Sequence, residues 1–507
     1  MLSVDGRSLT VDDLVRVARG EEKVRLAPAA AKRVDEGRRT LEAILARGTV
    51  AYGIKTGFGE LEHVVISDAD AKQLQLNLIR STAVGLGDPL PTEVVRGSLL
   101  LRANTLAKGH SGVRRAVVHL LLEMLNRGVH PAMPSRGSLG ASGDLAPLAH
   151  LSLVLIGEGR ADVRGEILGG ARALERAGLE PIVLEPKEGL ALINGTSVMT
   201  AVGALAVHDG HGLLKDAQIA ASVSFEALRG SPVPYDDRYV RLKPQPGARE
   251  VAANLRRLLR DSRIVASHKG AHRVQDPYSL RCIPQVLGAC RTAVDFAESA
   301  VRIEMNSATD NPLLFPEEAE SLSGGNFHGQ AVAMALDHLS LAMAVVAGFS
   351  ERRTARLVDG RLSELPPFLT RRGGLNCGLM VAQYVAAGYA SDNKVLAHPA
   401  SADSIPTSAN QEDYVPMGMS AALKARAALE NAQRVVALEY LAAAQGLEFL
   451  EPLKAGRGPR AARDLLRTKV APLEDDRSLS GDVEHILGWM RTGALVAAAE
   501  KAAGRLA

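Results

Sequence analysis

The spacing of apolar residues along the chain changes near residue 195. Before that point, short stretches with a helical period alternate with glycine-rich turns. Residues 92–127 show such a period, and it is interrupted between Gly109 and Gly112. We therefore predict helical structure on both sides of a glycine-rich break.

Beyond residue 195 the stretches become long and weakly polar, which predicts long helices. Four of them cover residues 198–228, 284–307, 329–358 and 419–450. We predict a mostly all-α protein, an elongated multi-helix bundle with a glycine-rich, loop-containing N-terminal lobe. The lobe covers 1–195, and the long-helix bundle with C-terminal peripheral helices covers 196–507, in one integrated unit.

Residues 329–358 are apolar on nearly every side of the predicted helix. One face carries Met334, Leu341, Val345 and Phe349, and other faces carry Leu336, Leu339, Met343 and Val346. A helix that is apolar all round has to be surrounded by other helices. This predicts a large bundle or a subunit interface, and hence a homo-oligomer.

The composition agrees with close-packed helices. Of the 507 residues, 46% are hydrophobic but only 3% are aromatic, so the apolar mass is mostly Ala, Leu and Val. The net charge is +3 and long basic runs are absent, which argues against a nucleic-acid partner. Three cysteines without a CxxC pair indicate a reducing compartment, here the cytoplasm. Neither a signal peptide nor a membrane span is expected.

Two histidine pairs have spacings that could place both rings on one helical face. They are His208/His211 and His268/His272. Neither pair has an HExxH context or an obvious third ligand. We expect surface or structural histidines and no metal site. Phosphate-loop and dinucleotide-binding signatures are also missing.

The segment 137–148 reads GSLGASGDLAPL. Its simple interpretation is a turn followed by a helix from Leu145 that Asp144 caps. Small residues also permit an unusual reaction, because the Gly143 nitrogen can approach the Ala141 carbonyl if the loop bends tightly. Ring closure and dehydration of Ser142 would give a 4-methylidene-imidazol-5-one. That electrophile is made from the backbone and needs no external cofactor.

This segment matches GSxGASGDLxPL, the hallmark of the histidine and aromatic amino acid ammonia-lyases, and the chain resembles that family elsewhere. The further matching segments are 52–59 (YGIKTGFG), 192–196 (LINGT), 274–282 (VQDPYSLRC), 324–329 (GGNFHG) and 408–413 (SANQED). The resemblance implies a mostly helical homotetramer with active sites shared between subunits. It implies elimination of ammonia from an aromatic L-amino acid, in which the Ala141-Ser142-Gly143 ring takes up the substrate amine.

The family pattern also assigns the base. Tyr52 matches the tyrosine that removes the β-proton, and the site has to favour its phenolate form. Lys55 stands where histidine ammonia-lyases usually carry Asn. It either assists Tyr52 through its charge or is a solvated surface lysine.

Further matches imply binding roles. Arg281 matches the residue that holds the substrate carboxylate, for which a bidentate guanidinium is suited. Asn194 matches the residue that orients the carboxylate or amine. Tyr278 and Gln275 match residues that line the electrophile, and Phe327 matches an aromatic wall of the pocket.

Substrate choice depends on two positions that point in different directions. Glu412 matches the glutamate that faces the imidazole in histidine-type enzymes, since a carboxylate beside a phenyl ring would be unpaired. Thr82, however, replaces a histidine of the family pattern that recognises the substrate ring. Tyr414 and Pro416 also depart from that pattern. We predict L-histidine, converted to trans-urocanate, with tyrosine as the competitor.

Two alternatives remain open at this level. An aromatic amino acid 2,3-aminomutase would use the same electrophile and return the amine to the β-carbon. A remote alternative is an inactive helical oligomer, which the joint presence of Tyr52, Ser142 and Arg281 argues against.

Overall fold

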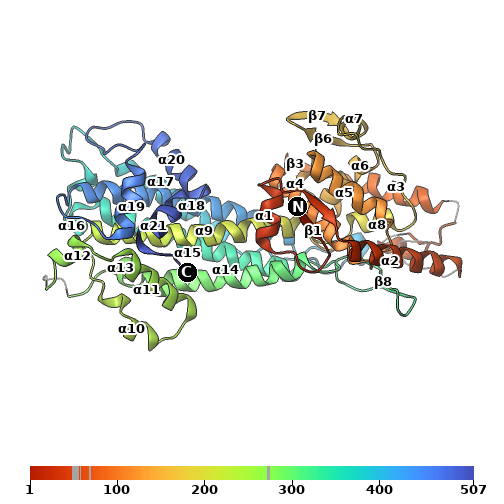
Figure 1. Cartoon of the computed structure of the whole chain (residues 1–507), viewed down its shortest axis with the longest axis horizontal. Helices are drawn as coiled ribbons and strands as arrows, with labels where there is room; N and C mark the ends of the chain where they lie inside the picture. The colour runs from red at the N-terminus through yellow and green to blue at the C-terminus, as the bar shows by residue number, and fades with distance from the viewer. Residues whose placement is uncertain (48–55, 58, 68–69, 271–273) are drawn as a thin grey trace. The chain divides into compact units, whose positions relative to one another are not determined.

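The computed structural model describes residues 1–47, 56–57, 59–67, 70–270 and 274–507 (Figure 1). These residues are mostly helical with few short strands, which confirms the predicted fold class. They form two compact units. The first comprises Met1–His208, Ala297–Asp337 and Pro399–Leu423, and the second comprises Asp209–Phe296, His338–His398 and Lys424–Ala507.

The first unit is built around a buried helix, α4 (Thr92–Leu106), whose residues from Val94 onward are all buried. It packs against α1 (Val11–Ala18) and α5 (Arg115–Arg127). The break between α4 and α5 contains both predicted glycines. α5 ends at Gly128, where a φ of 70° suits glycine and closes the helix.

The other helices of this unit include the one that follows the loop 137–144. α6 (Leu145–Leu155) follows the loop directly and packs against α3 (Ala71–Thr82) and α8 (Glu188–Ile193). Two further helices are α2 (Pro28–Ala46) and α7 (Gly170–Arg176), with 3₁₀ turns at Gly59–His63 and Ser408–Asn410.

Short strands pair at the edges of the first unit. The parallel pair is β1 (Leu2–Val4) with β2 (Val24–Leu26), in the register Leu2 to Val24. The antiparallel sheets comprise β3 (Leu86–Pro89) with β5 (Pro134–Arg136), β4 (Val129–Pro131) with β6 (Arg160–Val163) and β7 (Glu166–Gly169), and β8 (Leu313–Phe315) with β9 (Glu320–Leu322). The β3–β5 pair fixes the chain that enters the loop 137–144.

Four long helices match the four long stretches predicted from the sequence. They are α9 (Ser197–Ala227), α14 (Ile283–Met305), α15 (Gln330–Val358) and α18 (Gly418–Glu448). Each boundary lies within two residues of its prediction. The agreement follows from long weakly polar runs, which only a buried helix accommodates at this length.

The second unit adds shorter helices to its portions of these long ones. They are α10 (Asp237–Arg241), α11 (Pro246–Leu258), α12 (Arg263–Ser267), α13 (Tyr278–Arg281), α16 (Gly360–Ser363), α17 (Met380–Leu396), α19 (Arg457–Leu466), α20 (Ser480–Arg491) and α21 (Ala494–Ala503), with 3₁₀ turns at Val233–Tyr235 and Pro367–Leu369. α19 packs closely against α21, and α11 packs against both.

Helix α15 is buried on some faces and exposed on another. The side chains of Leu336, Leu339, Met343 and Val346 are fully buried, whereas Met334, Leu341 and Val345 are 57%, 50% and 40% exposed. α15 is also long and apolar enough to span a membrane, but 61% of its apolar window is buried in the fold. A core helix passes the same test, so this is weak support for a span.

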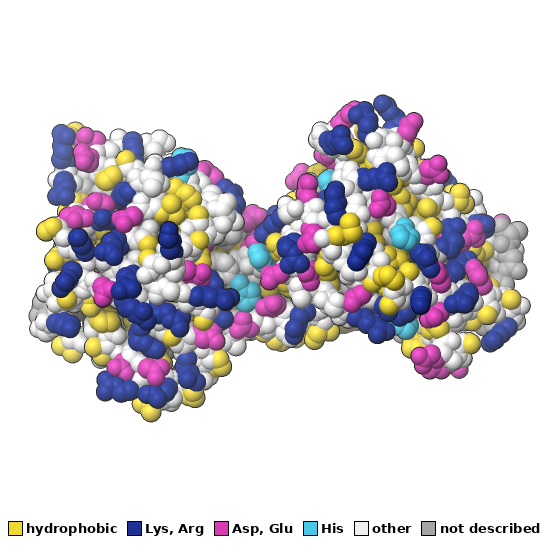
Figure 2. Space-filling model, viewed as in Figure 1, with side chains coloured by type: hydrophobic (Ala, Val, Ile, Leu, Met, Phe, Trp, Pro, Cys, Tyr) yellow, Lys and Arg dark blue, Asp and Glu magenta, His cyan; other side chains and the backbone are white. Residues whose placement is uncertain are grey.

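Charged side chains of both signs are mixed on the surface. On the face shown in Figure 2, Asp and Glu side chains lie among the Lys and Arg side chains in both parts of the molecule. This mixture fits the small net charge of +3.

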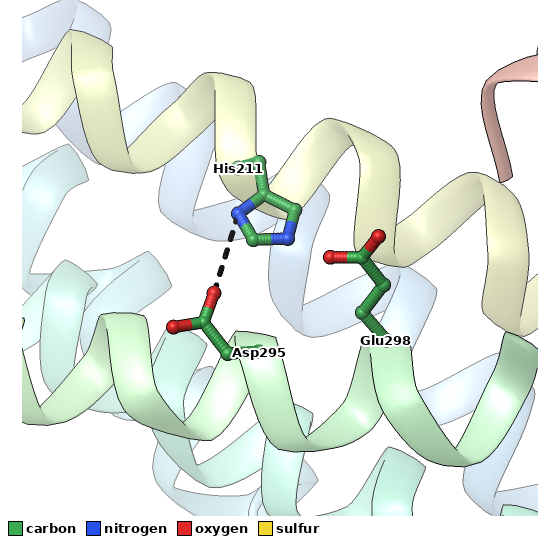
Figure 3. A group of neighbouring side chains, drawn as sticks. All are labelled: His211, Asp295 and Glu298. Atoms are coloured by element: carbon green, nitrogen blue, oxygen red, sulfur yellow. Dashed lines mark ion pairs between the residues drawn. The ribbon is translucent and has the colours of Figure 1, made fainter. Parts of the chain in front are cut away.

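The histidines singled out by their spacing have structural partners. His208 Nδ1 lies 3.4 Å from Asp12 in the first unit, and His211 on α9 points to Asp295 on α14, 4.0 Å away in the second (Figure 3). The ring nitrogens of His268 lie 2.7 and 3.1 Å from the carbonyl oxygens of Ile264 and Gly230. His272 lies outside the described residues.

Candidate active site

The loop Ala141-Ser142-Gly143 is held tightly against a second chain segment. The Gly195 N–H donates to the Ser142 carbonyl at 3.2 Å, and the Asp144 N–H donates to the Gly195 carbonyl at 2.7 Å. Gly143 has a φ of 76°, and a Cβ placed there would collide with the Gly195 carbonyl. Only glycine therefore fits at position 143. Ala141 is buried, and Ser142 is half-buried.

Asp144 ties this loop to the start of α9. Its Oδ2 accepts hydrogen bonds from the Val198 and Met199 N–H groups at 2.8 and 2.9 Å, and its Oδ1 accepts from the Ser138 hydroxyl at 2.9 Å. Burial raises the pKa of the Asp144 carboxyl to about 6. The predicted start of α6 at Leu145 is correct. The predicted cap is wrong, because this carboxylate bonds the N-terminus of α9 and makes no capping bond to α6.

Glu412 contacts the loop directly although it lies 270 residues away in the sequence. The Ser142 hydroxyl donates to Glu412 Oε1 at 2.8 Å. The Thr407 hydroxyl donates to Glu412 Oε2 at 2.7 Å, and a backbone bridge joins Thr407 to Glu412. Both carboxylate oxygens are thus oriented, with one of them on the serine whose dehydration was predicted.

The segment after Glu412 covers the loop from another side. Val415 and Met417 are buried and pack against Ala141. Tyr414 is half-exposed; its carbonyl oxygen lies 3.1 Å from His328 Nε2, and its ring stacks on the His328 ring. Pro416 is buried next to Gly140. Of the departures from the family pattern, Pro416 therefore lies beside the loop, and Tyr414 lies in the segment that covers it.

Asn194 is buried at the end of α8, directly before Gly195. Its Nδ2 donates to the Asn311 carbonyl at 3.2 Å and lies 3.4 Å from Asp310 Oδ1. Its carbonyl accepts from Arg102 Nη1 at 2.6 Å. Its Oδ1 has no partner within the described part of the chain. The side chain is thus fixed by its amide nitrogen, with its acceptor oxygen left to bind another donor.

An ion pair behind Asn194 is fully buried. Lys187 Nζ lies 2.6 Å from Asp310 Oδ2, and both side chains are 0% exposed. Burial lowers the pKa of Lys187, and the Asp310 carboxylate opposes that shift. Sequence reasoning missed Lys187, Asp310 and Arg102. The sequence signal available for such residues is a charged residue inside a mostly apolar stretch, as Arg102 is within α4.

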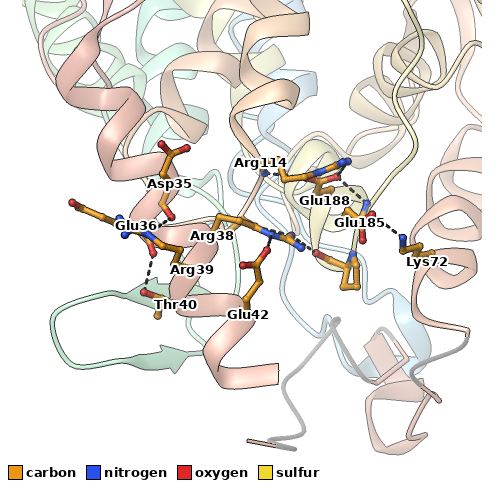
Figure 4. A network of polar contacts seen from close by, with 12 residues as sticks. Asp35, Glu36, Arg38, Arg39, Thr40, Glu42, Lys72, Arg114, Glu185 and Glu188 are labelled. Carbon is orange, nitrogen blue, oxygen red and sulfur yellow. Dashed lines mark hydrogen bonds and ion pairs between the residues drawn. The ribbon is translucent and has the colours of Figure 1, made fainter. Parts of the chain in front are cut away.

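A polar network anchors the start of α8, which carries Asn194 at its other end (Figure 4). Glu188 is fully buried; its carboxylate accepts from the Arg114 guanidinium at 2.7 and 2.8 Å and from the Glu185 N–H at 2.8 Å. Lys72 pairs with Glu185 at 2.7 Å, and Arg38 donates to the Pro186 carbonyl at 3.3 Å. The network fixes the position of the first turn of α8. Because α8 is short, it thereby fixes the position of Asn194 at the other end of the helix.

The other predicted residues of the first unit are Thr82 and Phe327. Thr82 is the half-buried last residue of α3, and the chain after it is held by a hydrogen bond from the Gly85 N–H to His150 Nε2 at 3.1 Å. Phe327 is half-buried in the turn before α15. Among the described residues, no hydrogen bond joins the Thr82 side chain to Ser142.

The second unit contains the remaining described candidates. Tyr278 opens α13 and is 69% exposed, and the Arg281 guanidinium lies 4.7 Å from its ring centroid. Gln275 is exposed just before this helix. Tyr52 and Lys55 lie outside the described residues.

Comparison with known proteins identifies relatives over the whole chain. Residues 9–468 match the family model of aromatic amino acid lyases. A histidine ammonia-lyase of Gloeobacter violaceus is 54% identical over 100% of this chain and 98% of its own length. The histidine ammonia-lyase structure from Trypanosoma cruzi matches with a TM-score of 0.92 at 39% identity, covering 99% and 95% of the two chains. A tyrosine aminomutase from Streptomyces globisporus matches with a TM-score of 0.95 at 36% identity, covering 100% of both.

Proposed function

The chain belongs to the aromatic amino acid lyase family, and we propose that it eliminates ammonia from L-histidine to give trans-urocanate. The observation that carries this proposal is the hydrogen bond between the Ser142 hydroxyl and Glu412. It sets a carboxylate, an acceptor for an imidazole N–H, beside the residue that becomes the electrophile. The family assignment makes the protein a carbon–nitrogen lyase.

The residues around Ala141, Ser142 and Gly143 fit the 4-methylidene-imidazol-5-one of this family. Gly143 has the positive φ and the absence of a side chain that a tight bend needs, and Gly195 holds the bend from outside. When formed, the ring supplies an electrophile that binds the substrate amine and makes it a better leaving group. We expect no external cofactor and no metal.

The chain's own residues bind and orient the substrate around that loop. In our proposal Asn194 uses its unpaired Oδ1 to bind the substrate ammonium, while Arg281 binds the carboxylate through two N–H groups. Tyr52 removes the β-proton as general base. Gln275 and Tyr278 line the site, and Phe327 with Thr82 bounds the space for the substrate ring.

We propose a homotetramer in which a partner subunit contributes Gln275, Tyr278 and Arg281 to each site. Two observations support assembly. Tyr278 is largely exposed in the single chain, with Arg281 stacked against it. The exposed apolar residues Met334 and Leu341 of α15 would be covered by neighbouring subunits. A cytoplasmic location fits the three free cysteines.

Tyrosine lyase or aminomutase activity is the second candidate. The Streptomyces globisporus tyrosine aminomutase matches this chain over its full length, and Thr82 replaces the histidine of the family pattern. Glu412 favours a substrate ring with a hydrogen-bond donor, and it supports histidine because it matches the glutamate that faces the imidazole in histidine-type members of the family.

The test is product analysis with purified protein. We expect L-histidine to give urocanate and ammonia, and Ser142→Ala to give neither. If tyrosine gives coumarate and histidine gives no urocanate, the predicted substrate is wrong, but the predicted elimination of ammonia is correct. A β-amino acid as the main product would instead identify a mutase.

A further inference from the structure

Arg102 is a fully buried cation next to the reacting loop that no role above explains. It lies on α4, and its Nη1 donates to the Asn194 carbonyl at 2.6 Å. Its Nε and Nη2 have no hydrogen-bond partner within the described ranges. Burial lowers the pKa of Arg102 to about 10, opposed by the carboxylates of Asp310 and Asp144, so the side chain stays charged at neutral pH.

A residue of this kind lowers the free energy of unfolding. A buried cation with unsatisfied donors is less favourable than an apolar side chain of similar size. The flanking Leu99, Leu100, Leu101 and Ala103 are all buried, so an apolar residue would suit this position. A local choice that lowers stability is expected where function requires it.

The hydrogen bond from Arg102 to the Asn194 carbonyl connects the cation to the loop through a single peptide. The Asn194 carbonyl accepts from Arg102, and the N–H of the same peptide, on Gly195, donates to the Ser142 carbonyl at 3.2 Å. A cation on the carbonyl side polarises a peptide and strengthens its N–H as a donor. A side chain on Gly195 would approach Arg102 Nη1 to 2.8 Å, so the guanidinium also limits where this peptide can lie.

We propose that Arg102 is a positioning residue for cyclisation, acting through the Asn194–Gly195 peptide on the Ser142 carbonyl. The inference rests on the proposed function, since it concerns how the electrophile forms. Asn194 and Gly195 transmit the effect of the cation, and the Ser142 carbonyl receives it.

The chemistry explains why this carbonyl matters. In ring closure the Gly143 nitrogen bonds to the Ala141 carbonyl carbon, whose oxygen leaves as water with one hydrogen from each of the Gly143 and Ser142 nitrogens, leaving a C=N bond. A second water takes the Ser142 hydroxyl and Cα hydrogen and leaves the methylidene. The Ser142 carbonyl is adjacent to that Cα, so a strong donor on its oxygen stabilises the negative charge that develops when the proton leaves.

The experiment compares the rate of ring formation in Arg102 and Arg96 variants. Arg96 lies on the same helix, is also buried, and donates to the backbone carbonyls of Val17 and Leu125, away from the loop. Ring formation is read as the intact-mass deficit of two waters and as the near-ultraviolet absorbance. Helical circular dichroism and thermal unfolding report the fold.

We expect Arg102→Met to fold and to form the ring at least about tenfold more slowly. Arg96→Met should also fold, and it should form the ring at the parent rate. A parent-like rate in Arg102→Met would overturn the proposal. If Arg102→Met does not fold, Arg102→Lys and Arg102→Gln decide: the charged lysine should form the ring faster than glutamine, and equal rates would overturn the role of the charge.

Two further results separate this inference from the proposed function. If the parent protein carries the mass deficit but releases no ammonia from histidine, the proposed substrate is wrong and the Arg102 comparison still stands. If the parent shows no deficit under any condition, the proposed electrophile is wrong and the inference is overturned with it.

Discussion

Two fully buried arginines, one in each unit, are bonded in different ways. Arg353 in the second unit donates through Nε and Nη2 to both oxygens of Glu439, at 2.5 and 2.7 Å. Glu439 also accepts from the hydroxyls of Ser224 and Ser350. Arg102 in the first unit makes one hydrogen bond, to a backbone carbonyl, and pairs with no carboxylate within hydrogen-bond distance among the described residues.

The different hydrogen bonds of Arg353 and Arg102 indicate different roles for the two buried arginines. A bidentate pair with its acceptors filled fixes helix positions and is costly to break, but it is directed at no reacting group. A single bond from a cation to one peptide is a poor way to stabilise a core and a good way to orient that peptide. In our proposal the buried Arg102 lowers the stability of the first unit, and in return it orients the Asn194–Gly195 peptide that binds the loop 141–143.

Removing the reacting hydroxyl separates chemistry from stability most strongly. Ser142→Ala should lower kcat with histidine by roughly a thousandfold or more, because the electrophile cannot form. The fold loses only one hydrogen bond at a half-buried position, a change of about 1 kcal/mol. Ammonia release and thermal unfolding measure the two effects. Near-parent turnover would exclude Ser142 from the chemistry.

The second unit should respond in the opposite way. Arg353→Met leaves the Glu439 carboxylate buried without its cation, and should lower the free energy of unfolding by about 3–5 kcal/mol. Ring formation in the chains that remain folded should match the parent. Denaturant unfolding gives the first quantity and intact mass the second. If Arg353→Met has the stability of the parent but forms the ring slowly, the contrast between Arg353 and Arg102 is wrong.

Glu412 tests whether the loop region also sets substrate choice. Glu412→Gln should lower kcat/KM for histidine by about ten- to a hundredfold, because a neutral amide holds the imidazole N–H less strongly. The exposed neighbour offers a control, and Asp413→Asn should change little. Equal losses for histidine and tyrosine would mean that Glu412 acts on the electrophile and does not select the ring.

The smallest effect concerns the chain after Thr82. Burial lowers the pKa of His150 below its usual 6.5, so at neutral pH its Nε2 accepts the Gly85 N–H. Arg160 on β6 also lowers this pKa, and the backbone carbonyl of Arg136 on β5 lies beside Gly85 together with the His150 ring. This contribution to stability is present above pH 6.5 and is lost as the pH falls through the lowered pKa.

We expect His150→Ala to raise KM about threefold at pH 7.5, since one hydrogen bond is lost. His150→Gln keeps an acceptor that does not titrate, so its KM should vary less than the parent's between pH 7.5 and 5.5. Steady-state kinetics over that range measures both. If KM of His150→Gln changes between pH 7.5 and 5.5 as much as KM of the parent, the pH dependence belongs to another group.

Sequence patterns predicted what depends on local chemistry. The long helices follow from runs such as 198–228, and the tight loop follows from Gly143 beside Ala141. The cap assigned to Asp144 was wrong because its partners, Val198 and Met199, come from a helix 54 residues further along. No local pattern carries that pairing.

Roles that depend on long-range contacts needed the structure. The matching motif identified Glu412, but not its bond to Ser142. Arg102 belongs to no quoted motif, and its partner Asn194 lies 92 residues away. The division of the chain at residue 195 stays a prediction. So do the roles of all the site residues, Ala141, Ser142, Gly143, Asn194 and Glu412 as well as Tyr52, Gln275, Tyr278, Arg281, Phe327 and Thr82.

The most direct test of the central claim is the intact mass of the purified parent protein beside Ser142→Ala. The account predicts that the parent is lighter than its sequence by two waters and that Ser142→Ala has its full sequence mass. A parent protein at full sequence mass that still releases ammonia from an aromatic amino acid would contradict it.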